Sequence, residues 1–262
     1  MRERERERKT YIYATVYNNV NRIASCLKSI TPLGDIIFVI VDNYSTDGTY
    51  ELLKKIKFKN LKIILMRTRC SRGKGRNIGL NIISKIANDN DKILYIDLDT
   101  VYTQKWISLV LSTKPKDNTL YYGFLSKLKV QKTLPWSDLN FSEDWERMAR
   151  AKSRGIRLIG VNKNMIGYME NERIENGLPR ENRYGGYLRR YKNMISCQRG
   201  MAYKSWQEFY DSAESHQNII LDKLIWISSY FIAQIKGVYS YDKNLDNFRF
   251  VMKGNKLSHH KK

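Results

Sequence analysis

Cysteine and histidine are scarce in this chain, which has 262 residues and only three of each. Cys26, Cys70 and Cys197 lie far apart and form no CxxC pair. The sequence therefore predicts free thiols in a reducing compartment rather than a disulfide framework. With only three histidines available to join these cysteines, no zinc site can be assembled either.

Long apolar segments are also missing. The longest uncharged apolar run extends from Leu224 to Ile235, between Lys223 and Lys236, whereas a membrane-spanning helix needs about 20 such residues. By this test we expect no transmembrane helix. The first nine residues alternate basic and acidic side chains and lack the apolar stretch of a secretory signal. We therefore expect a charged tail there, either solvated or a frayed helix, and a cytoplasmic protein.

Acidic residues are greatly outnumbered. The chain has 47 Lys and Arg against 26 Asp and Glu, which gives a net charge of +21 and a pI of about 9.8. Such a surplus predicts an anionic partner, for which nucleic acid, an acidic membrane surface and phosphorylated small molecules are the candidates. Hydrophobic residues make up 42% of the chain, enough for the core of one large domain with or without an appendage.

The first hundred residues alternate strands and helices. Strands are predicted at 11–17, 35–41, 61–66 and 93–96, and helices at 20–30, at 49–56 and from a glycine-rich loop to about residue 87. This order predicts a doubly wound, mostly parallel α/β sheet, in which ligands bind outside the carboxyl ends of the strands. Further along, we expect a strand within 117–130, a helix from 142 to about 154 and a short strand at 156–161.

Asp97 and Asp99 follow the predicted strand at 93–96 and are separated by one residue. If the chain stays extended there, alternation points both carboxylates to the same side. Two carboxylates on one rim suit a hard divalent ion such as Mg²⁺ or Mn²⁺ that also binds phosphate oxygens. The alternative is a strand followed by an Asp-rich turn.

Three further segments are candidates for the same rim, and each has a structural alternative. Gly73-Lys74-Gly75-Arg76 enters a helix and could cradle phosphate through backbone N–H groups, or could be a plain basic turn. Asp42 could accept a hydrogen bond from a base or a ribose, or could cap the next helix, where Thr46 or Asp47 are also available. Glu143-Asp144 could supply a catalytic base, or could simply stabilise a helix N-terminus.

Taken in order, these segments resemble the glycosyltransferase family 2 pattern on a GT-A fold. The resemblance covers about residues 10–161 and is carried by Tyr17-Asn18, by the segment 41–49, by Gly73 to Gly79, by Asp97-Leu98-Asp99 and by Glu143-Asp144. Three departures stand out. The proline that often precedes Tyr-Asn is absent, Asn43 occupies a position where a second Asp is common, and no Gln-x-x-Arg-Trp of processive polysaccharide synthases is present.

The resemblance implies direct, inverting transfer of a sugar from a nucleotide-diphosphate sugar of the UDP or GDP type to an unknown acceptor. It implies that Asp99 and Asp97 bind Mn²⁺ or Mg²⁺, and that Asp144, with Glu143 beside it, takes the proton from an acceptor hydroxyl. A lipid phosphate as acceptor would need no strong base. The nucleotide-binding residues that it implies are Thr15, Tyr17, Asn18, Asp42, Ser45, Arg72, Lys74, Asn77 and Asp97.

The second half resembles no family and predicts a looser organisation. We expect a charged tail at 1–9, a GT-A core at 10–161, a basic Gly/Tyr/Arg-rich loop region at 162–204 and a C-terminal helical extension with a polar tail at 205–262. The loop region could be a solvated surface or a lid over the diphosphate. Its cations include Arg180, Arg183, Arg189, Arg190, Lys192 and Arg199.

The apolar helix expected around Trp226 could pack on the core, or could lie in an anionic membrane interface and make the protein peripheral. Two other functions stay open on the sequence. A nucleotidyltransferase also uses paired carboxylates on an α/β sheet, and a basic nucleic-acid-binding protein would explain the charge. Nucleic acid is the less favoured partner, because the chain contains no zinc finger or RNP-type motif.

Overall fold

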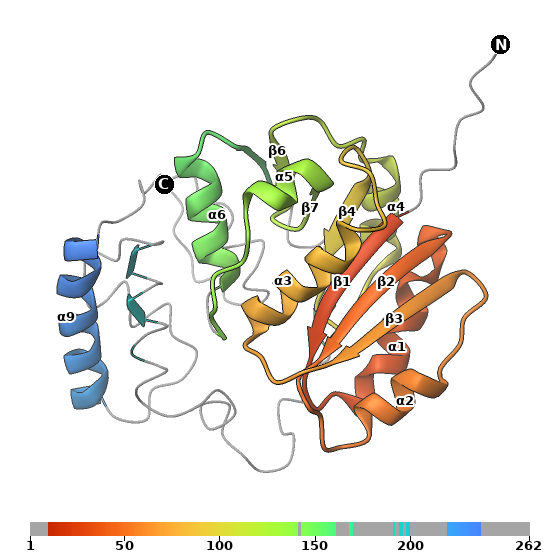
Figure 1. Cartoon of the computed structure of the whole chain (residues 1–262), viewed down its shortest axis with the longest axis horizontal. Coiled ribbons are helices and arrows are strands. Elements are labelled where there is room, and N and C mark those ends of the chain that lie inside the picture. The colour runs from red at the N-terminus through yellow and green to blue at the C-terminus, as the bar shows by residue number, and fades with distance from the viewer. Residues whose placement is uncertain are drawn as a thin grey trace.

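The structure is a computed structural model, and it describes residues 10–140, 143–160, 168–169, 191, 194–195, 198–199 and 219–236. Its centre is a seven-stranded sheet with the strand order β3-β2-β1-β4-β7-β6-β8 (Figure 1). The strands are β1 (Thr10–Val16), β2 (Ile36–Asp42), β3 (Leu61–Arg67), β4 (Lys92–Tyr95), β6 (Thr119–Tyr121), β7 (Leu125–Lys127) and β8 (Arg157–Ile159). A separate two-stranded sheet pairs β5 (Thr100–Val101) with β9 (Tyr168–Met169).

The first four strands of the main sheet are parallel, and the predicted α/β fold is confirmed. β1 pairs with β2 on one side and with β4 on the other, and β2 pairs with β3. The chain thus moves outward from β1 to β3 and then returns to the other side of β1. Such a reversal leaves a crevice at the carboxyl ends of β1 and β4, where doubly wound sheets bind ligands. The antiparallel β7 lies beside β4, and β6 and β8 continue the sheet beyond it.

Helices cover both faces of the parallel strands. In Figure 1, α3 crosses in front of β1, whereas α1 and α2 lie behind the sheet. The helices are α1 (Val20–Ile30), α2 (Thr49–Lys55), α3 (Arg72–Ile83), α4 (Gln104–Ser112), α5 (Leu128–Thr133), α6 (Glu143–Ser153) and α9 (Ile219–Lys236), and a 3-10 turn, η1 (Thr31–Leu33), follows α1. β2 is buried on both faces except at Ile37, as expected for a covered parallel strand.

The predicted elements of the core match the structure closely, with three differences. The single strand expected within 117–130 is a hairpin, because Tyr122 and Gly123 both adopt positive φ angles, of 59° and 80°, and reverse the chain. Helices α4 and α5 follow strands β5 and β7 where no helix was predicted. The helix expected to run to about residue 87 ends at Ile83.

Several expectations fall outside the described residues. They are the charged tail at 1–9, nearly all of the loop region at 162–204 with its cations other than Arg199, Cys197, and the polar C-terminal tail. In the described part of the chain, Cys26 and Cys70 are free thiols, as predicted. None of the described helices has the length and apolar character needed to cross a membrane.

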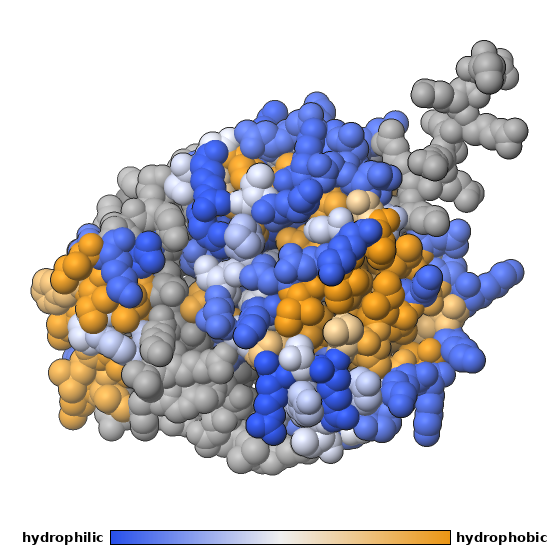
Figure 2. Space-filling model, viewed as in Figure 1, coloured by the Kyte–Doolittle hydropathy of each residue, from blue (hydrophilic) through white to orange (hydrophobic). Residues whose placement is uncertain are grey.

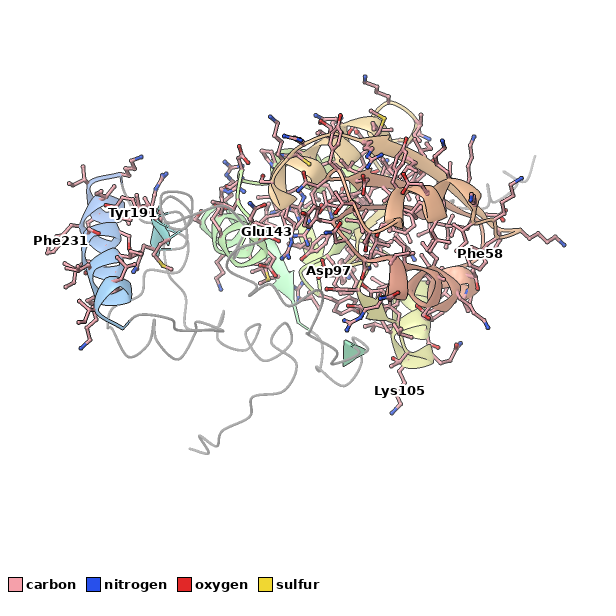
Figure 3. The ribbon with its side chains drawn as sticks, turned by 90° about the horizontal axis from the view of Figure 1, so that it is seen from below. Phe58, Asp97, Lys105, Glu143, Tyr191 and Phe231 are labelled. Carbon is pink, nitrogen blue, oxygen red and sulfur yellow. The ribbon has the colours of Figure 1, made fainter. Side chains whose placement is uncertain are left out.

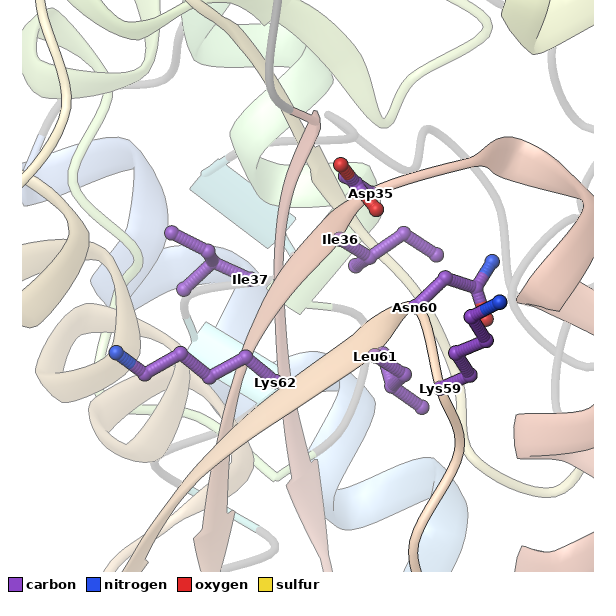
Figure 4. Close-up of a pocket in the computed structure, with 7 residues that line it drawn as sticks. All are labelled: Asp35, Ile36, Ile37, Lys59, Asn60, Leu61 and Lys62. Carbon is purple, nitrogen blue, oxygen red and sulfur yellow. The ribbon is translucent and has the colours of Figure 1, made fainter.

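One surface pocket lies at the opposite end of the sheet from the crevice. It has a volume of about 320 Å³ and is lined by the first residues of β2 and β3 and the turn before β3, including Asp35, Lys59 and Asn60 (Figure 4). Because these residues lie at the amino ends of parallel strands, this pocket is not the expected ligand site.

Candidate active site

The predicted acidic residues meet at the carboxyl ends of the parallel strands. Asp97 follows β4, and Glu143 is the first residue of α6, about 46 positions later in the chain. Figure 3 places the two side by side at the centre of the molecule. The residue that joins them is Arg76, from the second turn of α3. Its guanidinium donates from Nη2 to Asp97 Oδ1 and from Nη1 to Glu143 Oε1, both over 2.8 Å.

Arg76 is held in place by two aromatic rings as well as by two acids. Its guanidinium carbon lies 4.5 Å from the centroid of the Tyr95 ring and 4.4 Å from that of Trp136, within cation–π range of each ring. Those two rings meet edge to face at 4.5 Å. The Arg76 side chain is buried, so its position is fixed by packing and charge together.

Glu143 and Asp144 occupy different environments although they are neighbours. The Glu143 carboxylate is buried and accepts hydrogen bonds from Arg76 and, over 3.3 Å, from Arg72. Asp144 is half-buried. Burial and the charge of Glu143 raise the pKa of Asp144 to about 7, against an opposing effect of Arg76. A helix N-terminus lowers the pKa of a nearby carboxyl group, but here burial and the neighbouring carboxylate outweigh that effect.

Asp97 and Asp99 do not lie on one extended strand. β4 ends at Tyr95, and a turn at Leu98 and Asp99 leads into β5. Alternation along a strand therefore does not set the directions of the two carboxylates. The Asp97 side chain is 52% exposed, and its backbone N–H is fixed by the Tyr102 hydroxyl over 3.1 Å. Asp99 is half-buried.

This donor set fits a hard divalent ion that also binds a diphosphate. Mg²⁺ typically takes one or two protein carboxylates and completes its shell with water and substrate phosphates. Within the described ranges, no group of three His, Cys, Asp or Glu side chains could hold a metal ion unaided. Asp97 and Asp99 would therefore hold such an ion only together with the substrate.

Asp42 organises the loop after β2. Its carboxylate is fully buried, accepts from the Ser45 N–H over 3.2 Å and lies 3.2 Å from Arg67 Nε. The Ser45 hydroxyl in turn accepts from the Asn18 N–H over 3.0 Å, and the Asn18 side chain accepts from the Thr46 N–H over 2.8 Å. The expectation that Asp42 contacts the base is not supported by this structure, since its carboxylate is covered by its own loop.

Asp47 was one of the residues predicted to cap α2, but it lies one residue before the N-cap position. The N-cap position is Gly48, with a φ angle of 93°. The Asp47 carboxylate accepts from the Thr49 N–H and from the Val20 N–H, each over 3.0 Å. It therefore ties the starts of α2 and α1 together. Thr15 lies near the end of β1, and Tyr17 follows that strand and is exposed at the rim.

The glycine-rich segment is the first turn of α3 rather than a loop. Ser71 caps the helix by accepting from the Lys74 N–H over 3.1 Å. The N–H groups of Arg72 and Gly73 donate to Asn140 and Leu139, each over 2.9 Å. Because these backbone donors are already used, the predicted phosphate cradle is not present.

Asn77 has a structural role. Its side-chain amide pairs with the backbone of Trp136, donating to the carbonyl over 2.6 Å and accepting from the N–H over 2.7 Å. This pair holds the segment before α6 against α3 and keeps the Trp136 ring on Arg76. The expectation that Asn77 binds the nucleotide is not supported, because both polar groups of its side chain are occupied.

Sequence reasoning missed Arg76, Tyr95, Trp136 and Arg67 as site residues. Arg76 lies in the glycine-rich segment and Tyr95 in the strand before Asp97, both of which the sequence analysis considers. For Arg76, the available signal was its position immediately before Asn77 at the start of a helix. Arg67 ends β3 and lies under Tyr44 and Tyr50, at 5.2 Å and 4.4 Å from their ring centroids. No local pattern marks Trp136, whose role depends on contacts far away in the sequence.

Comparison with protein families gives a match over most of the chain. The family model described as Glycosyl transferase family 2 matches residues 11–171. None of the curated proteins matches the chain in sequence.

The solved structures to which the chain is similar include two at low identity. A mannosyltransferase from Pyrobaculum calidifontis in complex with GDP-Man and Mn²⁺ has a TM-score of 0.47 and 16% identity, over 86% of this chain and 69% of that one. A 4-diphosphocytidyl-2C-methyl-D-erythritol synthase has a TM-score of 0.47 and 10% identity, over 63% of this chain and 95% of that one.

Proposed function

The chain belongs to glycosyl transferase family 2 and is a glycosyltransferase, and we propose that it transfers a sugar from a nucleotide-diphosphate sugar, of the UDP or GDP type, with inversion at the anomeric carbon. The observation that carries this proposal is the bridge made by Arg76. One guanidinium joins Asp97, which follows β4, to Glu143, which opens α6. It thereby gathers a candidate metal ligand and the acidic helix start at one rim.

The donor would lie in the crevice at the carboxyl ends of β1 and β4. Asp97 and Asp99 would hold Mn²⁺ or Mg²⁺ there, and the ion would supply charge neutralisation at the departing diphosphate. Arg72 and Lys74 lie at the start of α3. They would add positive charge beside the diphosphate without using the backbone donors that the helix start has already engaged.

Asp144 would act as the base toward an acceptor hydroxyl. Glu143 is buried and shared between two arginines, which suits a positioning residue, whereas Asp144 is half-buried and carries a raised pKa. A base with a pKa near the working pH combines a useful ionised fraction with strong proton affinity. An acceptor that is itself an anionic phosphate would not need this group.

The test is a turnover assay on the whole protein with UDP- and GDP-sugars, in Mn²⁺, in Mg²⁺ and with a chelator. We expect release of nucleoside diphosphate with at least one donor, strongly reduced by chelation, and an anomeric configuration opposite to that of the donor in the product. Release of pyrophosphate instead would identify a nucleotidyltransferase. Salt-sensitive binding of DNA or RNA without any donor turnover would favour the nucleic-acid-binding alternative.

A further inference from the structure

Helix α9 has two faces of opposite character. Five large apolar side chains of this helix are exposed to solvent: Ile220, Leu224, Ile227, Phe231 and Ile235. With about 100° between successive residues, they fall within about 80° of arc and form one stripe along the helix, here called the α9 stripe. Ile225, Ser229 and Ala233 are buried and lie on the opposite face. The helix thus uses its other side for packing and leaves the α9 stripe uncovered.

The α9 stripe lies at the outer edge of the molecule. Figure 1 places α9 at one end, far from the parallel strands, and Figure 2 shows apolar surface over this helix. In Figure 3, Phe231 points away from the rest of the chain. From Ile220 to Ile235 the stripe is about 22 Å long at 1.5 Å per residue. Single apolar residues scattered over a protein surface are normal, whereas a contiguous row of this length is typical of an interaction surface.

The net charge of the chain distinguishes two possible partners of the α9 stripe, a second copy of the chain and an anionic surface. The chain carries a net charge of +21, so two copies that meet at this stripe would repel each other, whereas an anionic surface would attract the protein. Exposed Lys223 lies beside the stripe, and exposed Lys236 follows its last residue in the chain. A helix with an apolar face and basic residues beside it binds at the boundary between lipid headgroups and acyl chains.

We propose that the α9 stripe docks the protein on an anionic lipid surface. The apolar side chains insert between the headgroups, and the positive charge of the chain draws it to the surface and holds it there. This inference does not depend on the glycosyl transfer reaction, and its failure would leave the proposed donor and catalytic residues unaffected.

The experiment is co-sedimentation of the full chain with vesicles of phosphatidylcholine alone or mixed with phosphatidylglycerol. We expect binding to the mixed vesicles only, and a marked loss of binding at high salt, because screening weakens attraction between exposed charges. Leu224→Glu should weaken binding by about tenfold or more, because it replaces a leucine side chain that would insert into the lipid with a charged one.

A matched control comes from α4. Leu111 is 51% exposed and Leu224 is 59% exposed, so Leu111→Glu makes the same change of charge and polarity on another helix. It should retain most of the binding of the native chain. Circular dichroism of both variants checks that each is folded.

Three outcomes would overturn the proposal. Equal losses in the two variants would mean that net charge alone drives binding. Absence of binding to anionic vesicles at low salt would remove the lipid surface as partner. A dimer in light scattering that Leu224→Glu dissociates, without vesicle binding, would make the stripe an interface between copies.

Discussion

Arg76 and Glu143 form an ion pair of 2.8 Å in which both side chains are almost wholly removed from solvent. Such a pair is expensive to assemble, because both charges lose their hydration, and removing one partner strands the other. Here the cost is offset by further partners: Arg72 on the glutamate, and Asp97, Tyr95 and Trp136 on the arginine. The pair therefore makes the position of Asp97 depend on the packing of α3 and α6.

Arg76→Ala should lower the free energy of unfolding by about 3–5 kcal/mol, the usual cost of leaving one partner of a buried pair. Urea unfolding followed by circular dichroism measures it. Arg69→Ala is the control, because Arg69 is exposed and such a change costs about 0.5 kcal/mol or less. Equal unfolding midpoints for the two variants would show that the buried pair contributes nothing to stability.

Asp144→Asn should leave donor affinity intact and reduce turnover by about 10²-fold or more, the usual scale of general-base catalysis. The amide keeps the size of the side chain but cannot accept the proton. Donor affinity from calorimetry and turnover with a working acceptor are measured on the same preparation. Asp117→Asn, on an exposed carboxylate paired with surface lysines, is the matched control. Near-native turnover in Asp144→Asn would point to an acceptor that arrives charged.

The same residue predicts the pH dependence of turnover. Because the pKa of Asp144 is raised to about 7, the carboxyl group is mostly protonated below that pH and cannot serve as a base. Turnover should therefore rise with pH and level off above about 7. A bound divalent ion near Asp97 would favour the ionised form and move the midpoint lower. A profile of turnover against pH that is flat between 5 and 8 at about constant metal occupancy would contradict a base of this pKa.

Glu143→Gln should mainly cost stability, in contrast to Asp144→Asn. Successive residues of a helix point about 100° apart, so only one of the two can face the site. The structure adds that Glu143 bonds Arg76 and Arg72, so an uncharged amide would weaken two charge-assisted hydrogen bonds. We expect a lower urea midpoint with donor affinity still measurable. An unchanged midpoint with a large loss of turnover would instead make Glu143 the base.

The sheet could be predicted from the sequence because its signals are local. The continuous apolar run of β2 and the helical spacing of α1 each depend on neighbouring residues only, and α1 has the predicted bounds Val20–Ile30. The hairpin of β6 and β7 was missed because Tyr122 adopts a φ of 59°, a conformation that tyrosine rarely takes and that no local pattern signals.

The site was predicted only in part, for a related reason. Motif position predicted catalytic or metal-binding roles for the acids at 97, 99 and 144, which stay predictions, and it assigned Asn77 and Asp42 to the ligand. Their hydrogen bonds go instead to Trp136 and to the Ser45 loop, and these partners are fixed by the tertiary fold. A polar residue in a motif can serve either the ligand or the loop that carries it, and the sequence alone does not separate the two.

Asp99→Asn should abolish metal-dependent binding of a nucleoside diphosphate while the fold stays intact. The loss of one carboxylate removes charge and an oxygen ligand that a hard cation favours. Calorimetry of UDP and GDP with Mn²⁺, with Mg²⁺ and with a chelator gives the metal-dependent part of the affinity. Asp91→Asn, just before β4, is a control at the other end of that strand. Unchanged metal-dependent affinity in Asp99→Asn would remove the metal role of this residue.

Gly75→Ala should destabilise the protein through a single close approach between α3 and β1. A Cβ atom on Gly75 would lie 2.0 Å from the Thr15 Cγ2 methyl and 3.0 Å from Cys70 Sγ. Overpacking of this kind costs about 1–3 kcal/mol or more, and it would push away the helix that carries Arg76. The urea midpoint should fall, and Thr15→Ser should restore part of the loss, because serine lacks that methyl group.

Gly34→Ala separates this effect from the general cost of losing a glycine. Gly34 has a φ of 88° and nothing within 4 Å of the added Cβ, so its substitution should cost about 1–2 kcal/mol from backbone strain alone. Thr15→Ser should not restore that loss. A double-mutant cycle compares the two cases, since residues in contact give a coupling energy and distant residues add independently. If Thr15→Ser gave Gly75→Ala no more recovery than it gave Gly34→Ala, the packing of α3 on β1 would not be what requires glycine at position 75.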